Sequence, residues 1–410
     1  MARTLRILQI CHKPPRPSVD GGCLAMDSMT QGLLDMGHEV KVVSIHTDKH
    51  PFLPDQIEPG YLAQTQFEVA YADTELNVRD ALSHLVTGES YHLSRFLAPE
   101  MERIVEDALR VQVYDVVLLE SLFTTAYIPA IRRLSDADLV LRAHNVEHAL
   151  WDEVAADMSS RPKRWLLNRF KTKLQSEEIN VLASLDGVVT ITRDDAAWFE
   201  ETLQKVHPHS KCQVEVVPFG MDVDGTPHNA MNEAPSRALH LGAMDWAPNH
   251  QGVSWFVQDV WPLVRQAHPD AQVALAGRNM GPEWTSNPSA GVHVLGEVDD
   301  AAATYDTPSV VVVPLHAGSG MRIKIAEALA AGRPIVTTTK GMTGLPLKHG
   351  EHVMVADSAT DFAEALADLL SDGDKAIALG QRGRTWAQAN LQHRARAERL
   401  TAFLEELVAS

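Results

Sequence analysis

The sequence has few cysteines and no pattern that would use them. Only three of its 410 residues are cysteine, scattered at Cys11, Cys23 and Cys212. This spacing fits neither a disulfide framework nor a zinc site, so a reducing compartment, and with it a cytoplasmic location, is the simple interpretation. An HExxH motif and other clustered metal ligands are also missing, and we therefore expect chemistry that needs no protein-bound metal.

Long hydrophobic runs and an excess of positive charge are missing as well. No segment approaches the ~20 apolar residues that cross a bilayer, although attachment to a membrane surface stays open. The formal net charge is −18, which argues against nucleic-acid binding because the phosphate backbone repels such a protein. Hydrophobic residues make up 45% of the chain, as in a globular protein, and its length predicts two domains.

Short apolar runs alternate with helical patterns, which predicts an α/β protein with parallel sheets covered by helices on both faces. A polar, turn-rich segment at 222–237 is the expected linker between two doubly wound halves. Residues 1–224 would form the first domain and residues 236–391 the second, with a C-terminal helix at about 392–410 packed back on the first. Strands are expected at 5–11, 40–45, 116–119, 139–142, 187–192, 214–217, 272–276, 292–295 and 309–314. A further strand is expected from residue 238, at the start of the second half, and a helix at 253–266.

The most informative segment, residues 311–336, reads VVVPLHAGSGMRIKIAEALAAGRPIV. A buried strand leads into a small-residue loop and a helix that Gly332 ends. Free N–H groups and the helix dipole favour a phosphate at such a helix N-terminus. Arg322 and Lys324 stand where acidic residues are usual, which indicates a bound anion, and Glu327 is placed to accept hydrogen bonds from ribose hydroxyls. The alternative is an ordinary turn with solvated surface cations.

Candidates in the first half lie where strands end, since ligands of such sheets bind at the carboxyl ends of the strands and here in the cleft between the halves. Gly21 and Gly22 precede the first helix and allow a ligand to approach closely, although many such turns carry glycine and no GxGxxG fingerprint is present. His144 is placed to hydrogen-bond a sugar hydroxyl or a leaving phosphate; the alternative is a structural histidine. Glu147 and His148 are weaker candidates.

The first strand-to-helix loop of the second half, residues 242–249, is expected beside the anion site. Its sequence is GAMDWAPN. Gly242 and Asn249, together with backbone amides of the loop, are placed to meet a phosphate. Trp246 is either a stacking platform or a packing residue, and packing is the favoured interpretation.

A basic stretch at residues 161–173, RPKRWLLNRFKTK, contrasts with the acidic chain around it. Such a helix can lie on an anionic membrane or bind an acidic acceptor, and a solvated charged face is an equal alternative. The cations proposed for acceptor or membrane contact are Arg161, Lys163, Arg164, Arg169 and Lys171.

With these residues in view, nearly the whole chain resembles the glycosyltransferases of family 4, which have the GT-B fold of two Rossmann-like domains facing a central cleft. The resemblance rests on Gly21-Gly22 and on the segments at 142–147, 188–195, 216–222, 241–249, 276–279 and 318–332. It looks closest to a bacterial branch with a GGGTRLKILEA-type donor loop, often tied to exopolysaccharide and cell-envelope glycans. Members move a sugar from a nucleotide diphosphate to an acceptor, with retention at the anomeric carbon.

The resemblance implies roles for individual residues. Glu327 would hold the donor ribose, and His144 would lie beside the donor sugar near the reaction centre. Backbone amides of the loop before Arg322 would meet the diphosphate or the sugar. The donor-binding residues are then Gly21, Gly22, Gly242, Asn249, Arg278, Gly318, Ser319, Gly320, Met321 and Glu327.

Two departures from the family pattern matter. The usual donor loop has two glutamates eight positions apart, and Ser319 replaces the first, which puts the identity of the donor sugar in doubt. An Arg and a Lys often found in the loop at 242–249 are replaced as well. We infer that Arg322 and Lys324 supply this charge from the neighbouring loop and act as catalytic residues that stabilise the departing diphosphate.

The sequence thus predicts a retaining, hexosyltransferase-like and metal-independent glycosyltransferase of polysaccharide biosynthesis, with a nucleotide-sugar as co-substrate. Its acceptor would be a glycan, a lipid-linked glycan or a small molecule, and its location the cytoplasm, with a peripheral contact to the inner membrane. Two alternatives stay open: a nucleotide-sugar epimerase of the same architecture, and a binding protein that lost activity with the first glutamate. Donor base, donor sugar, acceptor and oligomeric state are not readable from the sequence.

Overall fold

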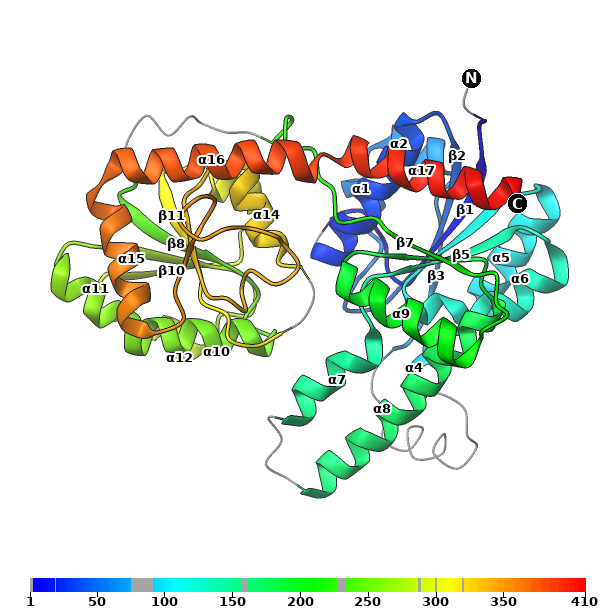
Figure 1. Ribbon diagram of the computed structural model, residues 1–410, viewed down its shortest axis with the longest axis horizontal. Coiled ribbons are helices and arrows are strands. Elements are labelled where there is room, and N and C mark those ends of the chain that lie inside the picture. The colour runs from blue at the N-terminus through cyan, green and yellow to red at the C-terminus, as the bar shows by residue number, and fades with distance from the viewer. Residues whose placement is uncertain are drawn as a thin grey trace. The chain divides into compact units, whose positions relative to one another are not determined.

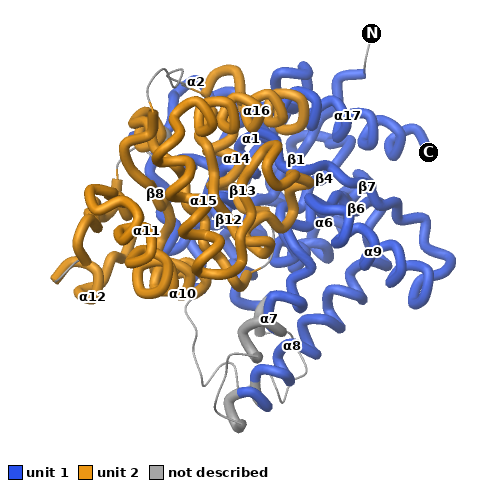
Figure 2. The backbone as a smooth tube through the Cα atoms, turned by 60° about the vertical axis from the view of Figure 1, so that its left-hand side comes forward, with its two compact units in different colours: residues 1–221, 393–410 blue, residues 222–392 orange. Residues whose placement is uncertain are grey.

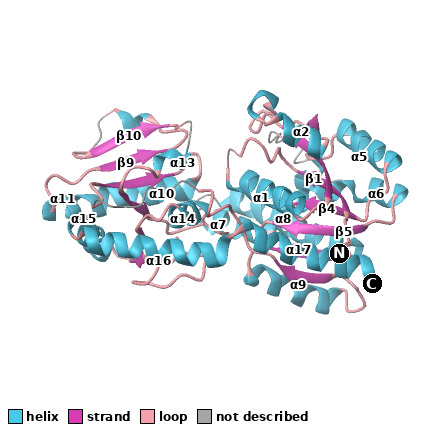
Figure 3. Ribbon diagram, turned by 90° about the horizontal axis from the view of Figure 1, so that it is seen from above, coloured by secondary structure: helices cyan, strands magenta, loops and turns pink. Residues whose placement is uncertain are grey.

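The structure, a computed structural model, divides into two compact units (Figure 2). Unit 1 comprises Met1–Met221 with His393–Ser410, and unit 2 comprises Asp222–Gln392. Each unit contains one parallel sheet with helices packed against it (Figures 1 and 3). This confirms the predicted α/β class. The structure describes residues 3–18, 20–74, 91–156, 161–226, 234–286, 289–298, 301–318 and 321–410.

The sheet of unit 1 has the strand order β3-β2-β1-β4-β5-β6-β7, and every pairing is parallel. Its central strands are buried on both faces, which is why they form nearly continuous apolar runs in the sequence. The strands are β1 (Arg6–Cys11), β2 (Glu39–His46), β3 (Glu68–Tyr71), β4 (Val116–Glu120), β5 (Asp138–Ala143), β6 (Gly187–Thr190) and β7 (Gln213–Val216).

Helices cover both faces of this sheet. Side chains of α5, α6 and α9 share one apolar core with the strands, and those of α1 and α17 share the other. The described helices of unit 1 are α1 (Gly21–Asp35), η1 (Pro54–Gln56), α2 (Pro59–Thr65), α4 (Tyr91–Ser94), α5 (Pro99–Val111), η2 (Leu122–Tyr127), α6 (Ile128–Leu134), α7 (Glu147–Ala156), α8 (Arg161–Val181), η3 (Leu182–Ser184), α9 (Arg193–Val206) and α17 (His393–Ala409).

The C-terminal helix α17 packs on α1. A Cβ on Gly32 would lie 2.5 Å from the Cβ of Ala397, so the two helices approach more closely than a side chain at position 32 would allow. The apolar side chains of α1 and α17 that meet in this core include Met26, Met29, Leu33, Leu400 and Leu404. The last 18 residues therefore complete unit 1, although unit 2 precedes them in the sequence.

Unit 2 has the parallel strand order β10-β9-β8-β11-β12-β13. Its strands are β8 (Arg237–Leu241), β9 (Val273–Ala276), β10 (Val292–Gly296), β11 (Ser309–Val313), β12 (Ile335–Thr337) and β13 (Met354–Val355). Its described helices are α10 (Ala247–Trp255), η4 (Phe256–Val260), α11 (Trp261–Ala267), α12 (Pro282–Thr285), α13 (Ala301–Thr304), α14 (Ile323–Ala330), α15 (Ala359–Ser371) and α16 (Gly373–Leu391).

The helix expected at 253–266 begins earlier than predicted. Pro248 stands in the first turn of α10, where its missing N–H and fixed φ favour a helix start. The helical path then continues through the π-helical turn η4 into α11. Asn249, predicted to lie in the loop, therefore belongs to the first turn of α10, and this part of the prediction was wrong.

None of the helices in the described parts of the chain has the length and apolar character needed to cross a bilayer.

Candidate active site

The predicted succession of strand, loop and helix is present in unit 2. β11 is fully buried, and α14 begins after Arg322, its N-cap residue. Gly332 ends the helix with φ of +68°, and the N–H of Arg333 donates to the carbonyl oxygen of Ala328 at 2.8 Å. The first turn of α14, which the structure describes in full, holds no acidic residue. The helix N-terminus is thus free of a carboxylate of its own that would compete with an anionic ligand.

The loop before α14 is described up to Gly318 and again from Met321, while Ser319 and Gly320 lie outside the described residues. Gly318 has φ of +98°, a left-handed conformation that favours glycine. The backbone of Met321 packs against Gly344, where a Cβ would lie 2.9 Å from the Cα of Met321. The amide contacts expected of the loop stay a prediction.

Lys324 extends from the first turn of α14 to the turn between β8 and α10. Its Nζ donates to the side-chain Oδ1 of Asn249 at 2.7 Å. A Cβ on Gly242 would lie 2.5 Å from the same Nζ, so a side chain there would displace the ammonium group. Burial and the nearby Arg322 lower the pKa of Lys324 to about 7, against the opposing effect of Glu327. The structure therefore brings two predicted donor-binding residues, Gly242 and Asn249, to the ammonium group of Lys324.

Glu327 is held by a residue that the sequence analysis did not single out. Tyr305, only 2% exposed, donates its hydroxyl to Oε2 of Glu327 at 3.4 Å and to the backbone oxygen of Lys324 at 3.3 Å. Burial raises the pKa of Glu327, while Tyr305 and Lys324 lower it. A carboxylate has about four lone-pair sites, so Glu327 keeps the capacity to accept hydrogen bonds from hydroxyls of a ligand.

Arg278 contributes a backbone hydrogen bond to this region. Its carbonyl oxygen accepts the N–H of Met244 at 2.9 Å, and the N–H of Gly242 donates to the carbonyl of Ala276 at 2.9 Å. These bonds tie the turn after β9 to the turn after β8. Contact between the Arg278 side chain and a donor stays a prediction.

In unit 1, His144 belongs to a buried polar cluster at the carboxyl ends of β1, β4 and β5. Glu120, fully buried at the end of β4, accepts from Nη1 of Arg142 at 3.1 Å and from Nε2 of Gln9 at 2.9 Å. Its Oε2 lies 2.8 Å from Nε2 of His144. The ring of His12 meets that of His144 edge-on, with centroids 5.6 Å apart. The sequence analysis missed Glu120 and Gln9 because both lie inside apolar runs.

Burial and charge set the protonation of this cluster. Burial raises the pKa of Glu120, but Arg142 and His144 outweigh it and bring the value to about 2, so Glu120 is a carboxylate. Burial lowers the pKa of His144 by more than the bond to Glu120 raises it. A neutral imidazole that donates Nε2–H to a carboxylate presents Nδ1 as an acceptor. His144 is therefore prepared to accept a hydrogen bond from a ligand hydroxyl.

Glu147 and His148 form a second buried group with Glu178 of α8. Oε1 of Glu178 accepts the N–H of Glu147 at 2.9 Å, and its Oε2 lies 2.6 Å from Nδ1 of His148. Burial and the charge of Glu178 raise the pKa of Glu147 to about 8. These contacts join the start of α7 to α8, so a structural role accounts for both residues.

Gly21 and Gly22 open α1, whose N-cap residue is Asp20. The side chain of Asp20 accepts the N–H of Cys23 at 2.9 Å, and both its oxygens accept from Nζ of Lys13 at 2.7 Å. A Cβ on Gly22 would lie 2.8 Å from that ammonium group. The space beside Gly22 thus holds an ion pair of the protein itself, and an approach of this loop to the donor stays a prediction.

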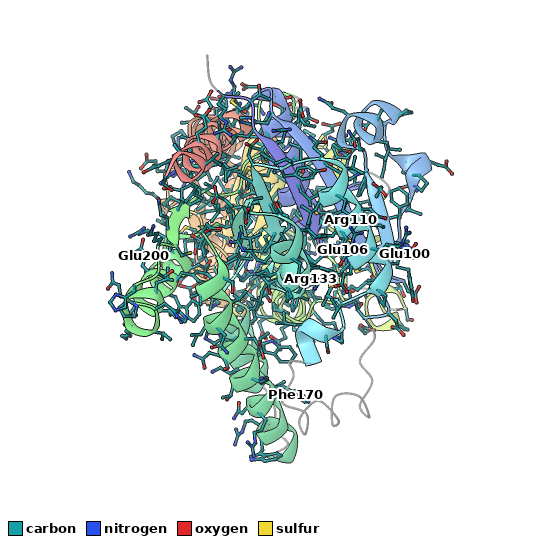
Figure 4. The ribbon with its side chains drawn as sticks, turned by 90° about the vertical axis from the view of Figure 1, so that its right-hand side faces the viewer. Glu100, Glu106, Arg110, Arg133, Phe170 and Glu200 are labelled. Atoms are coloured by element: carbon teal, nitrogen blue, oxygen red, sulfur yellow. The ribbon has the colours of Figure 1, made fainter. Side chains whose placement is uncertain are left out.

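The basic stretch forms the first half of α8, which runs beside α7 away from the sheet of unit 1 (Figures 1 and 2). Phe170, labelled in Figure 4, marks this part of the helix. Arg164 and Arg169 are exposed, Lys171 is half-buried, and Trp165 is 61% exposed with Cζ of Arg169 at 5.2 Å from its ring centroid. Two further candidates, Arg161 and Lys163, belong to α8, but their side chains lie outside the described part of the structure.

Comparison with known proteins finds a family match in unit 2 and relatives over more of the chain. A profile described as Glycosyl transferases group 1 matches residues 235–372, within unit 2. An uncharacterized 44.6 kDa protein in the cps region of Klebsiella pneumoniae is 23% identical over 382 residues, which is 88% of this chain and 89% of that protein. The phosphatidyl-myo-inositol mannosyltransferase of Mycobacterium leprae is 31% identical over 172 residues, or 38% of this chain and 43% of that protein.

Solved structures share the fold at low sequence identity. Sucrose-phosphate synthase of Thermosynechococcus elongatus matches with a TM-score of 0.69 at 19% identity, covering 99% of this chain and 100% of that one. HepE of Anabaena, in complex with UDP, matches with a TM-score of 0.66 at 13% identity, covering 98% and 100%. Together with the family match in unit 2 and the two parallel sheets, these likenesses identify the chain as a glycosyltransferase with the GT-B fold.

Proposed function

We propose that this glycosyltransferase moves a hexosyl group from a nucleoside diphosphate sugar to an acceptor hydroxyl, with retention at the anomeric carbon. The observation that carries the proposal is the pair of cations, Arg322 and Lys324, at the start of a helix whose first turn holds no acid. Two cations, free N–H groups and the helix dipole together favour a diphosphate at this position. A UDP-glucose complex of HepE and the GDP-mannose dependence in the name of a Mycobacterium tuberculosis relative make UDP and GDP the first donors to test.

In the proposed reaction, the bond between the anomeric carbon and the donor phosphate oxygen breaks, and a bond to the acceptor oxygen forms on the same face. The acceptor proton passes to the leaving phosphate oxygen. Because negative charge grows on the diphosphate, Arg322 and Lys324 stabilise the transition state more than the ground state. This positive charge would make a metal ion unnecessary. Glu327, oriented by Tyr305, would hold the ribose, and His144 would accept from a sugar hydroxyl through Nδ1.

We propose a glycan, a lipid-linked glycan or a small molecule as acceptor, in polysaccharide biosynthesis at the cell envelope. The relative in the cps region of Klebsiella pneumoniae and the mannosyltransferase of phosphatidyl-myo-inositol support this range. A lipid-linked acceptor would be met at the cytoplasmic face of a membrane. The enzyme would then work in the cytoplasm with a peripheral membrane contact.

Nucleotide binding tests this proposal directly. A thermal-shift screen with UDP, GDP, ADP, dTDP and NAD should give a clear rise in melting temperature with one nucleoside diphosphate. A ligand at about 100 times its dissociation constant stabilises by ~2.7 kcal/mol, which corresponds to several degrees. The shift should be lost in Glu327→Ala, which removes the proposed ribose contact, and kept in Glu364→Ala, an exposed glutamate of α15 in the same unit.

Other outcomes would change the assignment. A response to NAD alone would indicate an oxidoreductase, and no response to any of the five ligands would contradict a nucleotide-sugar enzyme. Once the donor is known, its conversion without any acceptor would favour the epimerase. Binding without conversion, across many acceptors, would favour a protein that has lost its activity.

The basic half of α8 is the surface that we propose for contact with anionic lipid. Arg164 and Arg169 are exposed beside the exposed indole of Trp165, and this basic, aromatic surface lies on a protein of net charge −18. Cations near an anionic bilayer contribute about 1 kcal/mol each, and an indole settles readily at the lipid headgroups. Without these cations, the negatively charged protein would be repelled by an anionic bilayer.

Vesicle sedimentation tests this surface. The double variant Arg164→Glu with Arg169→Glu should bind vesicles of phosphatidylcholine with one third phosphatidylglycerol at least about twentyfold more weakly at low salt, given about 1 kcal/mol for each lost cation and more for each added anion. Reversal of Arg103 and Arg110, which lie on α5 of the same unit (Arg110 is labelled in Figure 4), is the matched control. Unchanged sedimentation of the α8 variant would remove the membrane contact.

A further inference from the structure

Trp246 is exposed where a packing residue would be buried. It is the N-cap residue of α10 and has 38% of its surface exposed, whereas Trp261 and Trp284 of the same unit are 1% and 8% exposed. The sequence favours a packing role for Trp246. The exposure and the contacts of its ring indicate a role other than packing, because a half-exposed indole contributes much less to a core than a buried one.

The ring of Trp246 lies against the guanidinium of Arg322. Cζ of Arg322 is 5.2 Å from the ring centroid, within the range in which an aromatic face attracts a cation. Arg322 itself is only 5% exposed. A Cβ on Gly318 would lie 2.8 Å from Cζ2 of Trp246 and 2.9 Å from Nη2 of Arg322. The positive φ of Gly318 thus brings the backbone of one loop against the side chain of the other and against the guanidinium.

The backbone of Trp246 is connected to the second cation of the site. Its carbonyl oxygen accepts the N–H of Asn249 at 2.9 Å and that of His250 at 3.2 Å, which forms the first turn of α10. The side chain of Asn249 in turn accepts from Nζ of Lys324. Trp246 at the end of this loop thus contacts Arg322 through its indole, and Asn249 in the first turn of α10 holds Lys324 through its amide, although residues 242–249 include no cation.

We propose that Trp246 is a positioning residue whose indole holds the guanidinium of Arg322 ready for the diphosphate of the donor. This inference rests on the proposed function. An arginine side chain has many rotamers, and ordering them on binding weakens affinity. A guanidinium already held against an indole loses less freedom when the donor arrives, and its planar fork of N–H donors matches phosphate oxygens. Trp246 would thus act on donor binding through Arg322, without touching the donor.

Isothermal titration calorimetry with UDP and GDP, and with UMP and GMP, distinguishes this positioning role from simple packing and from stacking on the nucleotide. Trp246→Phe keeps an aromatic face, while Trp246→Leu keeps apolar bulk without one, so both variants suit the fold. We expect Trp246→Leu to weaken binding of the preferred diphosphate about tenfold and Trp246→Phe at most about threefold. In an Arg322→Ala background, Trp246→Leu should have no further effect. Trp386→Leu, at a half-buried tryptophan of α16 that packs on His352, is the control and should leave affinity unchanged.

Four results would contradict the inference, and each leads to a different conclusion about Trp246 or the donor. Equal losses for Trp246→Phe and Trp246→Leu, with lower melting temperatures, would mean that Trp246 only packs. Losses that add to those of Arg322→Ala, and that are as large for UMP or GMP as for the diphosphate, would mean that Trp246 stacks on the nucleotide itself. If the unmodified protein bound neither UDP nor GDP, the proposed donor would be wrong, and the inference would fail with it. Binding of UDP or GDP without energetic coupling between Trp246 and Arg322 would contradict this inference and leave the proposed function intact.

Discussion

Replacing Arg322 and Lys324 together by alanine is expected to lower kcat/KM for sugar transfer about a thousandfold. Removing one preorganised group that faces developing charge typically lowers kcat by 10²–10³. In the proposed site the two cations would share one diphosphate, so their single losses should not simply add. Their loss should act mainly on kcat, because the charge on the diphosphate is greater in the transition state than in the bound donor.

Steady-state kinetics with the donor named by the thermal-shift screen, at saturating acceptor, would measure this loss. Lys348→Ala with Arg382→Ala is the matched control: both cations belong to unit 2, both contact Glu351, and the net charge changes by the same amount. The control should keep near-normal turnover. Near-normal turnover of the Arg322 and Lys324 variant would contradict the assignment of these residues to the leaving group.

The pH dependence of donor binding provides a further test of Lys324. Because burial and Arg322 lower the pKa of Lys324 to about 7, its ammonium form is lost from the free protein as pH rises through that value. A bound diphosphate favours the charged form, so binding above pH 7 must include uptake of a proton. Donor affinity should therefore fall between pH 6.5 and 8.5 in the unmodified protein, and fall less in Lys324→Met.

The fold was predictable where long, regular patterns determine it. β1, β4, β5 and β11 are buried throughout or nearly so, and their apolar runs show in the sequence. The edge strands β3 and β13 were missed because they are short and partly exposed, which leaves little pattern to read. The start of α10 was missed because Pro248 resembles a turn residue as much as a first-turn helix residue.

The candidate site was predictable in part, for a related reason. Arg322, Lys324 and Glu327 stand in one local motif, so their placement follows from the strand, the loop and the helix. Tyr305 reaches Glu327 from 22 residues away, and no spacing rule links the two. The role of Trp246 depends on a meeting of two loops that the sequence separates by more than 70 residues. Such partners are determined by tertiary structure, which local patterns do not encode.

Removal of the Glu120 carboxylate is expected to destabilise unit 1 by about 3–5 kcal/mol, the usual effect of breaking a buried ion pair from one side. Glu120 and Arg142 are both 0% exposed, and Nη1 of Arg142 lies 3.1 Å from Oε2 of Glu120. In Glu120→Leu the guanidinium would stay buried without its carboxylate, and Gln9 and His144 would lose an acceptor. Hydrogen exchange of the amides of β1, β4 and β5 under increasing urea measures this loss within unit 1.

The double variant Glu120→Leu with Arg142→Met separates the ion pair from the rest of the cluster. Because the variant buries neither charge, it should be more stable than the sum of the two single losses predicts, by about 1–3 kcal/mol. Strict additivity would contradict a coupled pair. The pKa of Glu120 lies near 2 in the folded protein, below the ordinary value of 4.5. Its contribution to stability is thus present above about pH 4.5 and is lost as pH falls toward 2, so the difference between the unmodified protein and Glu120→Leu should shrink over that range.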